Sequence, residues 1–241
     1  FPIKKPVEQD WSFAGPFGTY DKGQLQRGFK VYREVCAACH SMNLVAFRNL
    51  TDLGYSDAQV RAIAAEYEVE DGPDDAGDMY MRPAKPSDRF PAPFANPQQA
   101  AASNSGAVPP DFSLIAKARA VERGFPTFVF DIFTQYAEAG PDYIHALLTG
   151  YSDDTEGHEV PAGTYYNPYF LSSASLAMAP PLSEGMVTYD DGRSVCARYL
   201  RVPDVGCRAA HGSTQVHGLR GHDLPSALRR SGLSDQAQDL V

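Results

Sequence analysis

The sequence predicts a mostly α-helical domain with long irregular loops and little strand. Apolar residues make up 43% of the 241 residues, which is enough to bury a core and excludes global disorder. Gly 20 and Pro 19 together form about a sixth of the chain, more than a regular helical bundle usually carries. Apolar residues recur at helical spacing in several short segments, whereas we find no series of alternating strands.

The first predicted helix begins after Asp21, a residue type that favours the N-cap position, and runs to about Val35. Leu25, Phe29 and Tyr32 fall on one face of this helix, with basic and polar residues opposite. Asp57 is expected to cap a second helix near residues 58–67. Further helical segments are expected at residues 112–123, starting after Pro110, and at residues 127–136 and 142–151.

The charge of the chain is strongly acidic, with a formal net charge of −9. Residues 66–78 contain seven acids and no base, and the proline-dense segment 82–97 that follows predicts irregular structure. An acidic chain is a poor match for nucleic acid and a good one for a basic protein. The acidic segment is therefore either a solvated loop or a docking surface for a basic redox partner.

The motif Cys36-Ala37-Ala38-Cys39-His40 carries the most specific chemistry in the sequence. Two thiols separated by two residues can add to the two vinyl groups of haem, and the adjacent histidine then binds the iron. A zinc site needs a second ligand pair, and Cys196 and Cys207 lie far along the chain with ten residues between them. A redox CxxC usually follows a strand rather than a helix. We therefore predict one covalent haem c.

The sixth iron ligand has several candidates: Met42, Met79, Met81, Met178, Met186, His145 and His158. Met42 is too close to His40 in the chain to reach the opposite face of a haem. Met178 is followed by Ala179 and two prolines, which fix the backbone and would hold a thioether in place. We expect Met178 to be the ligand, with Met186 as the next candidate and Met81 as a distant third.

Two further groups are expected around such a haem. The second ring nitrogen of His40 needs an acceptor, and a backbone carbonyl near Pro109 and Pro110 would serve. Buried propionates need cationic donors, and Arg119 is the best candidate. Lys117 and Arg123 are alternatives, and all three could instead be solvated residues on a helix face.

Motifs beyond CxxCH resemble the cytochrome c1 family from about Trp11 to Gly192. They include segments 27–32 (RGFKVY), 45–48 (VAFR), 79–83 (MYMRP), 104–107 (NSGA), 109–111 (PPD), 148–151 (LTGY), 166–170 (YNPYF) and 178–181 (MAPP). The resemblance implies a large class I-type cytochrome c fold. It also implies thioethers at Cys36 and Cys39, axial ligands at His40 and Met178, and a propionate-binding arginine at Arg119.

The resemblance further implies a function and a location. Family members are electron-carrying subunits of the quinol–cytochrome c oxidoreductase (bc1) complex, without substrate chemistry of their own. They act beside cytochrome b, take an electron from the Rieske iron–sulfur protein and pass it to a soluble cytochrome c. Their haem domain lies on the periplasmic side of the bacterial inner membrane or its mitochondrial equivalent, and they usually have a cleaved leader and a C-terminal membrane anchor. The first residue is Phe1 and not Met, so we expect that a leader has been removed.

Residues 193–241 depart abruptly from the family, so we divide the chain into a haem domain at 1–192 and an aberrant tail at 193–241. Degenerate back-translation, read one base later around residues 199–211, permits ISAFLMWAAEPHM, similar to the family's C-terminal helix. The same shift lets residues 233–241 read YLTKRKIW, similar to the polar end after the anchor. We therefore expect a frameshifted reading of the helix and anchor. In the c-type fold that helix crosses the N-terminal one, with the close contact at Gly28 and Phe29.

Two other readings of the chain remain open at this point. One is a soluble monohaem electron carrier, which a tail without an anchor would suggest. The other is a haem enzyme or gas sensor whose distal site is open. Binding of CO to the reduced protein distinguishes the last reading from stable Met178 ligation, and co-purification with cytochrome b distinguishes the first.

Overall fold

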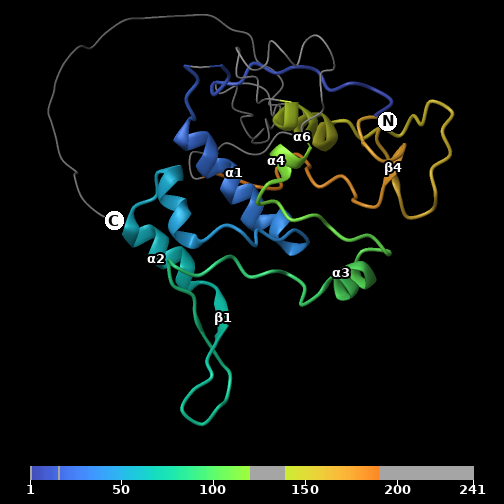
Figure 1. Ribbon diagram of the computed structural model, residues 1–241. Helices are drawn as coiled ribbons and strands as arrows, with labels where there is room; N and C mark the ends of the chain where they lie inside the picture. Colours follow the sequence, from blue (N-terminus) through green and yellow to red (C-terminus); the bar gives the residue numbers. More distant parts are fainter. Residues whose placement is uncertain (1, 16, 120–138, 190–241) are drawn as a thin grey trace, which may run out of the picture. The chain divides into compact units, whose positions relative to one another are not determined.

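The computed structural model describes residues 2–15, 17–119 and 139–189 of the chain (Figure 1). It is mostly helical, with few short strands and long loops, as the sequence predicts. The helix expected at residues 127–136 and the whole tail after residue 189 lie outside the described residues. Within the described ranges, no helix is both long and apolar enough to cross a membrane.

The first helix, α1 (Lys22–Glu34), confirms the expected boundaries. The Asp21 side chain accepts a hydrogen bond from the Gly23 amide at 2.8 Å, which satisfies one of the free donors at the helix start. The helix buries Phe29 and Tyr32 on one face. It ends directly before the short 3-10 helix η1 (Cys36–Ala38), so the cysteine motif is attached to the most regular element of the fold.

The second helical layer consists of η2 (Phe47–Leu53) and α2 (Asp57–Ala65). The prediction that Asp57 caps α2 is wrong, because Ser56 is the cap and forms a reciprocal capping box with Gln59. Asp57 is instead the first helical residue, where its charge is favourable near the positive end of the helix dipole. The helix also ends at Ala65, two residues before the expected Tyr67.

These elements share one hydrophobic core. Phe47, fully buried, contacts the ring of Phe90 at a centroid distance of 4.2 Å. Since Phe90 lies within the proline-dense segment, this loop is held to the core by an aromatic anchor rather than by secondary structure. The buried members of the core are Phe29, Tyr32, Phe47, Leu50, Val60, Ile63, Ala64, Ala84 and Phe90.

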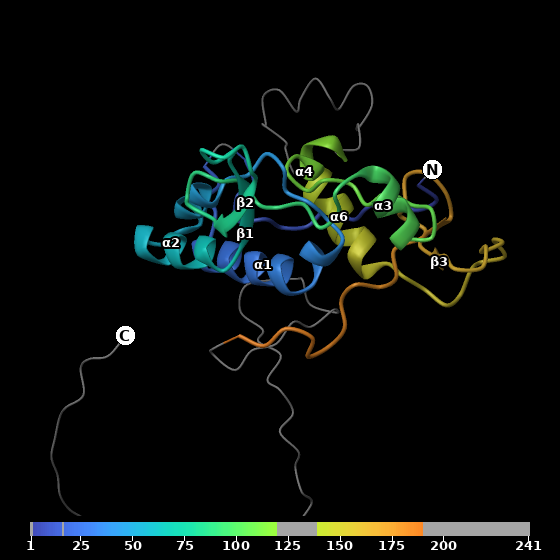
Figure 2. The ribbon, with the colours of Figure 1, turned by 90° about the horizontal axis from the view of Figure 1, so that it is seen from below.

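An antiparallel hairpin follows α2, formed by β1 (Glu68–Asp71) and β2 (Tyr80–Pro83) (Figures 1 and 2). Glu68 pairs with Pro83 and Asp71 pairs with Tyr80. Neither strand was expected from the sequence, because both are short and the acidic run shows no apolar alternation. The loop between the strands carries the remaining acids of the segment, and the Asp74 carboxylate accepts from the backbone amides of Ala76 and Asp78.

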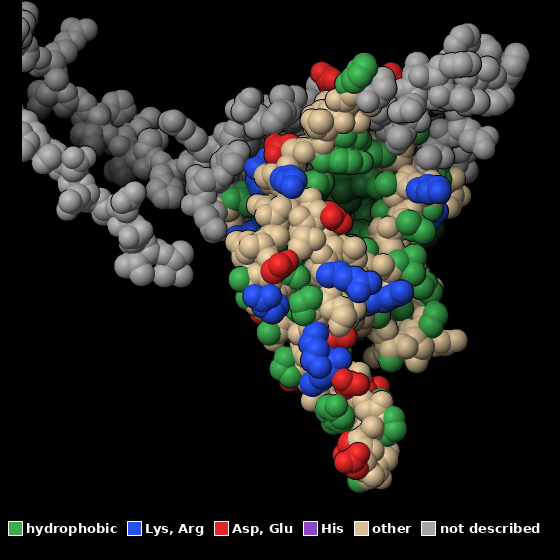
Figure 3. All heavy atoms as spheres, turned by 60° about the vertical axis from the view of Figure 1, so that its left-hand side comes forward, with side chains coloured by type: hydrophobic (Ala, Val, Ile, Leu, Met, Phe, Trp, Pro, Cys, Tyr) green, Lys and Arg blue, Asp and Glu red, His purple; other side chains and the backbone are tan. Residues whose placement is uncertain are grey.

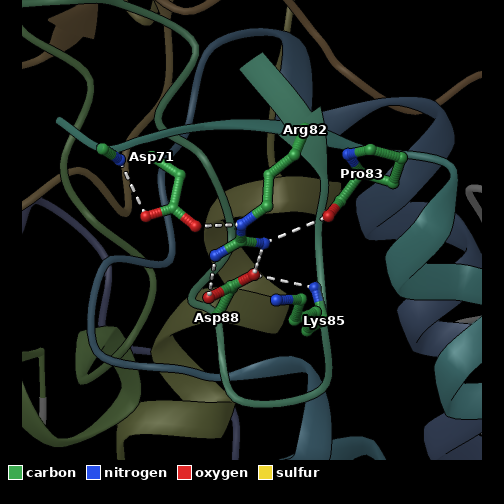
Figure 4. A network of polar contacts seen from close by, with 6 residues as sticks. Asp71, Arg82, Pro83, Lys85 and Asp88 are labelled. Atoms are coloured by element: carbon green, nitrogen blue, oxygen red, sulfur yellow. Dashed lines mark hydrogen bonds and ion pairs between the residues drawn. The ribbon is translucent and has the colours of Figure 1, made fainter. Parts of the chain in front are cut away.

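A single guanidinium fastens this hairpin to the loop that follows it (Figure 4). Arg82 donates to Asp88 through both terminal nitrogens, at 2.6 and 3.2 Å, and through Nε to Asp71. These hydrogen bonds to Arg82 are the main reason that the pKa values of both carboxyl groups lie below their usual range. Because Asp88 lies two residues before Phe90, the base of the hairpin is tied to the core.

The second half of the described chain contains α3 (Pro97–Ser103), α4 (Ile115–Ala118), α6 (Ala139–Thr149) and the small antiparallel pair β3 (Tyr165–Tyr166) and β4 (Ser175–Leu176). Residues 112–114 are not helical, so the expected helix at 112–123 starts three residues late. Helix α6 corresponds to the helix expected at residues 142–151, but it starts three residues earlier and ends two residues earlier.

Helices α4 and α6 pack closely, and Figure 2 shows them side by side. The contact depends on Gly140 in the first turn of α6. A Cβ atom there would lie 1.8 Å from the carbonyl oxygen of Ala116. On its other side, α6 holds the N-terminal segment, because buried Asp142 accepts from the Gln9 amide and the Trp11 indole N–H at 3.0 and 2.8 Å.

We therefore expect Gly140→Ala to destabilise the domain by about 1–3 kcal/mol, since the methyl group meets a backbone atom and α4 must shift. Thermal unfolding of the purified protein measures this. Gly23→Ala is the matched control, because a Cβ there meets only side-chain atoms, at 3.3 Å. Equal melting temperatures for the two variants would contradict the close packing of α4 and α6.

Candidate haem site

The cysteine motif forms one tight turn directly after α1. The amides of Cys39 and His40 both donate to the Cys36 carbonyl, at 3.1 and 2.8 Å. Both cysteines are free thiols and half-buried. The turn therefore presents two thiols and one imidazole from five consecutive residues, which is the arrangement that covalent haem attachment requires.

The electrostatics of Cys36 do not suit a redox thiol. Burial, with a smaller contribution from Cys39, raises the pKa of the Cys36 thiol to about 11. Reactive CxxC thiols have depressed pKa values because a helix N-terminus or a cation stabilises the thiolate. Here the motif follows the C-terminal end of α1 instead. Within the described ranges, no group of three or more His, Cys, Asp and Glu side chains could hold a metal ion.

His40 is buried, with 9% of its surface exposed. Its Nδ1 lies 2.8 Å from the carbonyl oxygen of Pro110, one of the two prolines near which we expect the acceptor for this nitrogen. A carbonyl only accepts, so Nδ1 carries the proton and the lone pair is on Nε2. Burial lowers the pKa of the imidazole, partly opposed by this hydrogen bond, so the ring is neutral at neutral pH. This is the form that ligates iron.

Two aromatic residues fix the position of this histidine. The ring of Phe112 stacks on the imidazole at a centroid distance of 4.2 Å. The Tyr32 hydroxyl donates to the His40 carbonyl at 3.1 Å, so the buried face of α1 contacts the site directly. The tautomer and the ring orientation of His40 are thus set by the segment around Pro110 and Phe112, and its backbone is held by α1.

Met178 is half-buried and lies two residues after β4, directly before Ala179 and Pro180. The Tyr151 hydroxyl donates to the Met178 carbonyl at 3.0 Å. Tyr151 follows α6, so this hydrogen bond fastens the Met178 loop to a helix. Burial raises the pKa of this phenol, which keeps it a donor.

The other candidate ligands are placed less favourably. Met79, Met81 and Met186 have 52%, 58% and 47% of their surface exposed. Met42 packs against the hydrophobic core. His145 lies edge-on to the Trp11 ring and His158 stacks on Tyr166, so both imidazoles pack on aromatic residues of the fold.

Arg119 is half-buried at the C-terminal cap of α4. Burial raises the pKa of the Tyr143 phenol, and the positive charge of Arg119 partly opposes this rise. A guanidinium and a phenol together form a donor pair suited to a carboxylate. Lys117 is exposed, and Arg123 lies outside the described residues.

Three supporting residues escaped the sequence analysis: Asp111, Tyr143 and Tyr151. Asp111 accepts from the Ser41 hydroxyl and from the Asn43 and Ser113 amides. Its position after two prolines was the only available hint, since an Asp there favours a local turn. Nothing in the sequence alone indicates which backbone groups the two tyrosines would contact.

The donor set fits a haem. The described residues supply two free thiols, one neutral imidazole with its lone pair on Nε2, one thioether held by a hydrogen-bonded loop, and one half-buried guanidinium. No described residue donates a hydrogen bond to Nε2 of His40, so this nitrogen is available. Only the two thiols would change chemically when a haem binds, because they would form thioethers.

Comparison with known proteins agrees with this chemistry. Residues 11–199 match the model of the cytochrome C1 family. A protein named cytochrome b/c1 from Bradyrhizobium diazoefficiens is 58% identical over 192 residues, which cover 78% of this chain and 28% of that protein. Cytochrome c1 of Blastochloris viridis is 49% identical over 191 residues, covering 78% of this chain and 67% of that protein.

The similarity extends to mitochondrial proteins. The mitochondrial cytochrome c1 haem protein of Saccharomyces cerevisiae is 46% identical over 183 residues, covering 76% of this chain and 53% of that protein. The chain thus spans between a quarter and two thirds of the length of these relatives. The shared part contains the whole of the cysteine turn and the Met178 loop.

The buried thiol yields a pH prediction for the haem-free chain. With a pKa of about 11, Cys36 should be alkylated at pH 8 about 100-fold more slowly than a thiol with the ordinary value of 9.0. Its rate should keep rising with pH up to about 11. Site-resolved mass spectrometry measures the rate, and the free peptide 33–42 is the control. A rate equal to that of the peptide would show that the turn does not bury the thiol.

Proposed function

Because the chain belongs to the cytochrome c1 family, we propose that it is the electron-transfer haem subunit of a quinol–cytochrome c oxidoreductase (bc1) complex. Cys36 and Cys39 hold one haem c through thioethers. The observation that carries the proposal is the cysteine turn with the buried, neutral His40 whose Nδ1 proton is fixed on Pro110. The haem supplies a single iron that changes oxidation state by one electron.

His40, through Nε2, and Met178, through its thioether sulfur, would be the two residues that ligate the haem iron. Thioether ligation raises the reduction potential and leaves no open coordination position, which suits electron transfer rather than binding of small molecules. The Pro110 carbonyl fixes the imidazole tautomer, and Tyr151 fixes the Met178 loop. Arg119 binds a propionate, with the Tyr143 hydroxyl as a second donor.

The electron path follows from this assignment. The chain accepts an electron from the Rieske iron–sulfur protein and passes it to a soluble cytochrome c, in a complex that also contains cytochrome b. It performs no substrate chemistry of its own. The haem domain lies on the periplasmic side of the bacterial inner membrane, or on the equivalent mitochondrial side, and is membrane-associated.

The acidic hairpin, defined as residues 66–83, docks the basic soluble cytochrome c. Figure 3 shows the hairpin with acidic side chains near its tip and hydrophobic side chains beside them. Met79, Tyr80 and Met81 are 52%, 46% and 58% exposed, so an apolar patch accompanies the acids. Opposite charge steers a fast, weak encounter, and a small apolar patch gives the short-lived complex its contact. Arg82 holds the hairpin in place for this role.

The tail at 193–241 is a frameshifted reading of the C-terminal helix and membrane anchor. The match to the family model ends at residue 199, seven residues past the proposed boundary. Gly28 supports the same proposal, since a Cβ atom added there would meet no described atom within 4 Å. A glycine in mid-helix costs about 1 kcal/mol relative to Ala, which is understandable where another helix must approach closely.

Replacement of Met178 tests the axial ligand. In Met178→Leu the thioethers remain, so the haem stays bound, but the iron loses its sixth ligand. The reduced variant should bind CO, and its reduction potential should fall by on the order of 0.1 V. Met186→Leu is the matched control and should behave like the wild type. If Met178→Leu refused CO, another residue would be the ligand. If the wild type itself bound CO, the chain would be an open-site haem protein.

Reversal of one charge tests the docking surface. Asp75 is exposed in the loop of the acidic hairpin, so Asp75→Lys should slow electron transfer to a basic cytochrome c about three- to tenfold at low ionic strength. The effect should shrink at high salt, since the charges are then screened. Asp52→Lys in η2 changes the net charge equally and is the control. Equal rates for both variants would place the docking surface elsewhere.

Substitution of Gly28 tests the frameshift. In a chain that carries the shifted reading, Gly28→Ala should destabilise the domain by about 1–3 kcal/mol, because the C-terminal helix approaches this position. In the chain with the tail of the printed sequence, the same change should stabilise α1 by about 1 kcal/mol. Chemical denaturation of both pairs measures the difference. Stabilisation in both chains would contradict the proposal.

A further inference from the structure

We propose that Asp111 is the positioning residue for the proximal ligand, holding the His40–Pro110 hydrogen bond in the geometry that sets the reduction potential. The inference rests on the proposed haem ligation by His40. It adds a residue that neither the family comparison nor the haem-binding motif assigns. The observation is that one carboxylate joins the chain segment that follows His40 to the chain segment that follows Pro110.

The carboxylate binds both segments at once. Its Oδ2 accepts from the Ser41 hydroxyl at 2.8 Å and from the Asn43 amide at 2.7 Å. Its Oδ1 accepts from the Ser113 amide at 2.8 Å, which forms a local turn after the two prolines. Each oxygen thus has at least one donor, and the donors come from both sides of the junction.

The neighbouring backbone completes the junction. The Phe112 amide donates to the Ser41 carbonyl at 2.8 Å, and the Leu44 amide donates to the Ser113 hydroxyl at 2.9 Å. Segments 41–44 and 110–113 are therefore joined at successive positions, although about 70 residues separate them in sequence. Neither segment is part of a helix or strand.

The two residues adjacent to this junction are the ones that matter for the iron. His40 directly precedes Ser41, and Pro110 directly precedes Asp111. The junction therefore sets the 2.8 Å distance between Nδ1 and the Pro110 oxygen. It also places the Phe112 ring against the imidazole. A shift of either segment lengthens the hydrogen bond and tilts the ring.

The consequence for the iron follows from ligand basicity. A strong Nδ1–H···O bond makes the imidazole a better electron donor at Nε2, which favours the oxidised iron. Loss of the junction weakens that bond, so the reduction potential should rise. Loss of a residue that orients a metal ligand typically costs about 10- to 100-fold in metal affinity or activity. We expect the lower end here, because the covalent thioethers keep His40 near the iron.

The experiment uses the full chain with its haem and compares Asp111→Asn, Asp111→Glu and Asp111→Ala with the wild type. The first readout is the equilibrium constant for reduction against a fixed redox dye. All three variants should favour the reduced state, by about tenfold in Asp111→Ala. Asp21→Asn is the control, since Asp21 caps α1 away from this junction, and it should leave the equilibrium unchanged.

Asp111→Glu separates positioning from simple charge. Glu keeps the negative charge but is one methylene longer, so it cannot bind the same three donors. If Asp111 acted only through its charge, Asp111→Glu would match the wild type and Asp111→Asn would not; this result would overturn the proposal. Ser41→Ala, which removes one donor and no charge, should shift the equilibrium in the same direction as Asp111→Ala.

A second readout reports on the hydrogen bond itself. The Nδ1 proton of His40 should exchange with solvent at least about tenfold faster in Asp111→Ala than in the wild type, because an open bond exposes it. Reduced variants that still refuse CO retain Met178, so the shift then arises on the proximal side. If the wild type lacks a six-coordinate haem, the proposed function fails. If the wild type is six-coordinate and the variants show unchanged equilibrium and exchange, only the role of Asp111 fails.

Discussion

The hydrogen bond between His40 and Pro110 is the interaction on which the site depends. It links the end of α1 to a segment 70 residues away, and it decides which nitrogen of the imidazole carries the proton. Because His40 is buried and its pKa is lowered, the ring is neutral and its Nε2 lone pair is available. The Phe112 ring stacks on this imidazole, and the Cys36 carbonyl and the Tyr32 hydroxyl bind the backbone of His40.

The rest of the domain supports this one contact with few regular elements. The core formed by α1, η2 and α2 fixes one side of the junction, and the Phe90 loop adds an aromatic anchor. Polar side chains then join the loops. Asp111 joins segments 41–44 and 110–113, and Arg82 binds Asp71 and Asp88 at the hairpin. Tyr151 binds the Met178 loop. Such loops can hold precise geometry because buried and half-buried polar groups bind specific backbone atoms.

The sequence predicts local chemistry well and distant pairing poorly. The limits of α1, the cysteine motif and the Pro110 acceptor follow from capping, helical spacing and the need of a ligating imidazole for a partner. The hairpin at β1 and β2 could not be predicted, since both strands are short and the acidic run shows no apolar alternation. Likewise, Ser56 rather than Asp57 caps α2, because the reciprocal bond with Gln59 decides between two good capping residues. Asp111 escaped notice because its donors lie about 70 residues away.

The most direct test of the account is peptide mass mapping of the mature protein after cleavage at arginine. Peptide 34–48, bounded by Arg33 and Arg48, contains Cys36, Cys39 and His40. We predict that this peptide carries the mass of one haem and that neither of its thiols can be alkylated. A mature peptide of unmodified mass with two free thiols would contradict the central claim, because the turn would then hold no covalent haem.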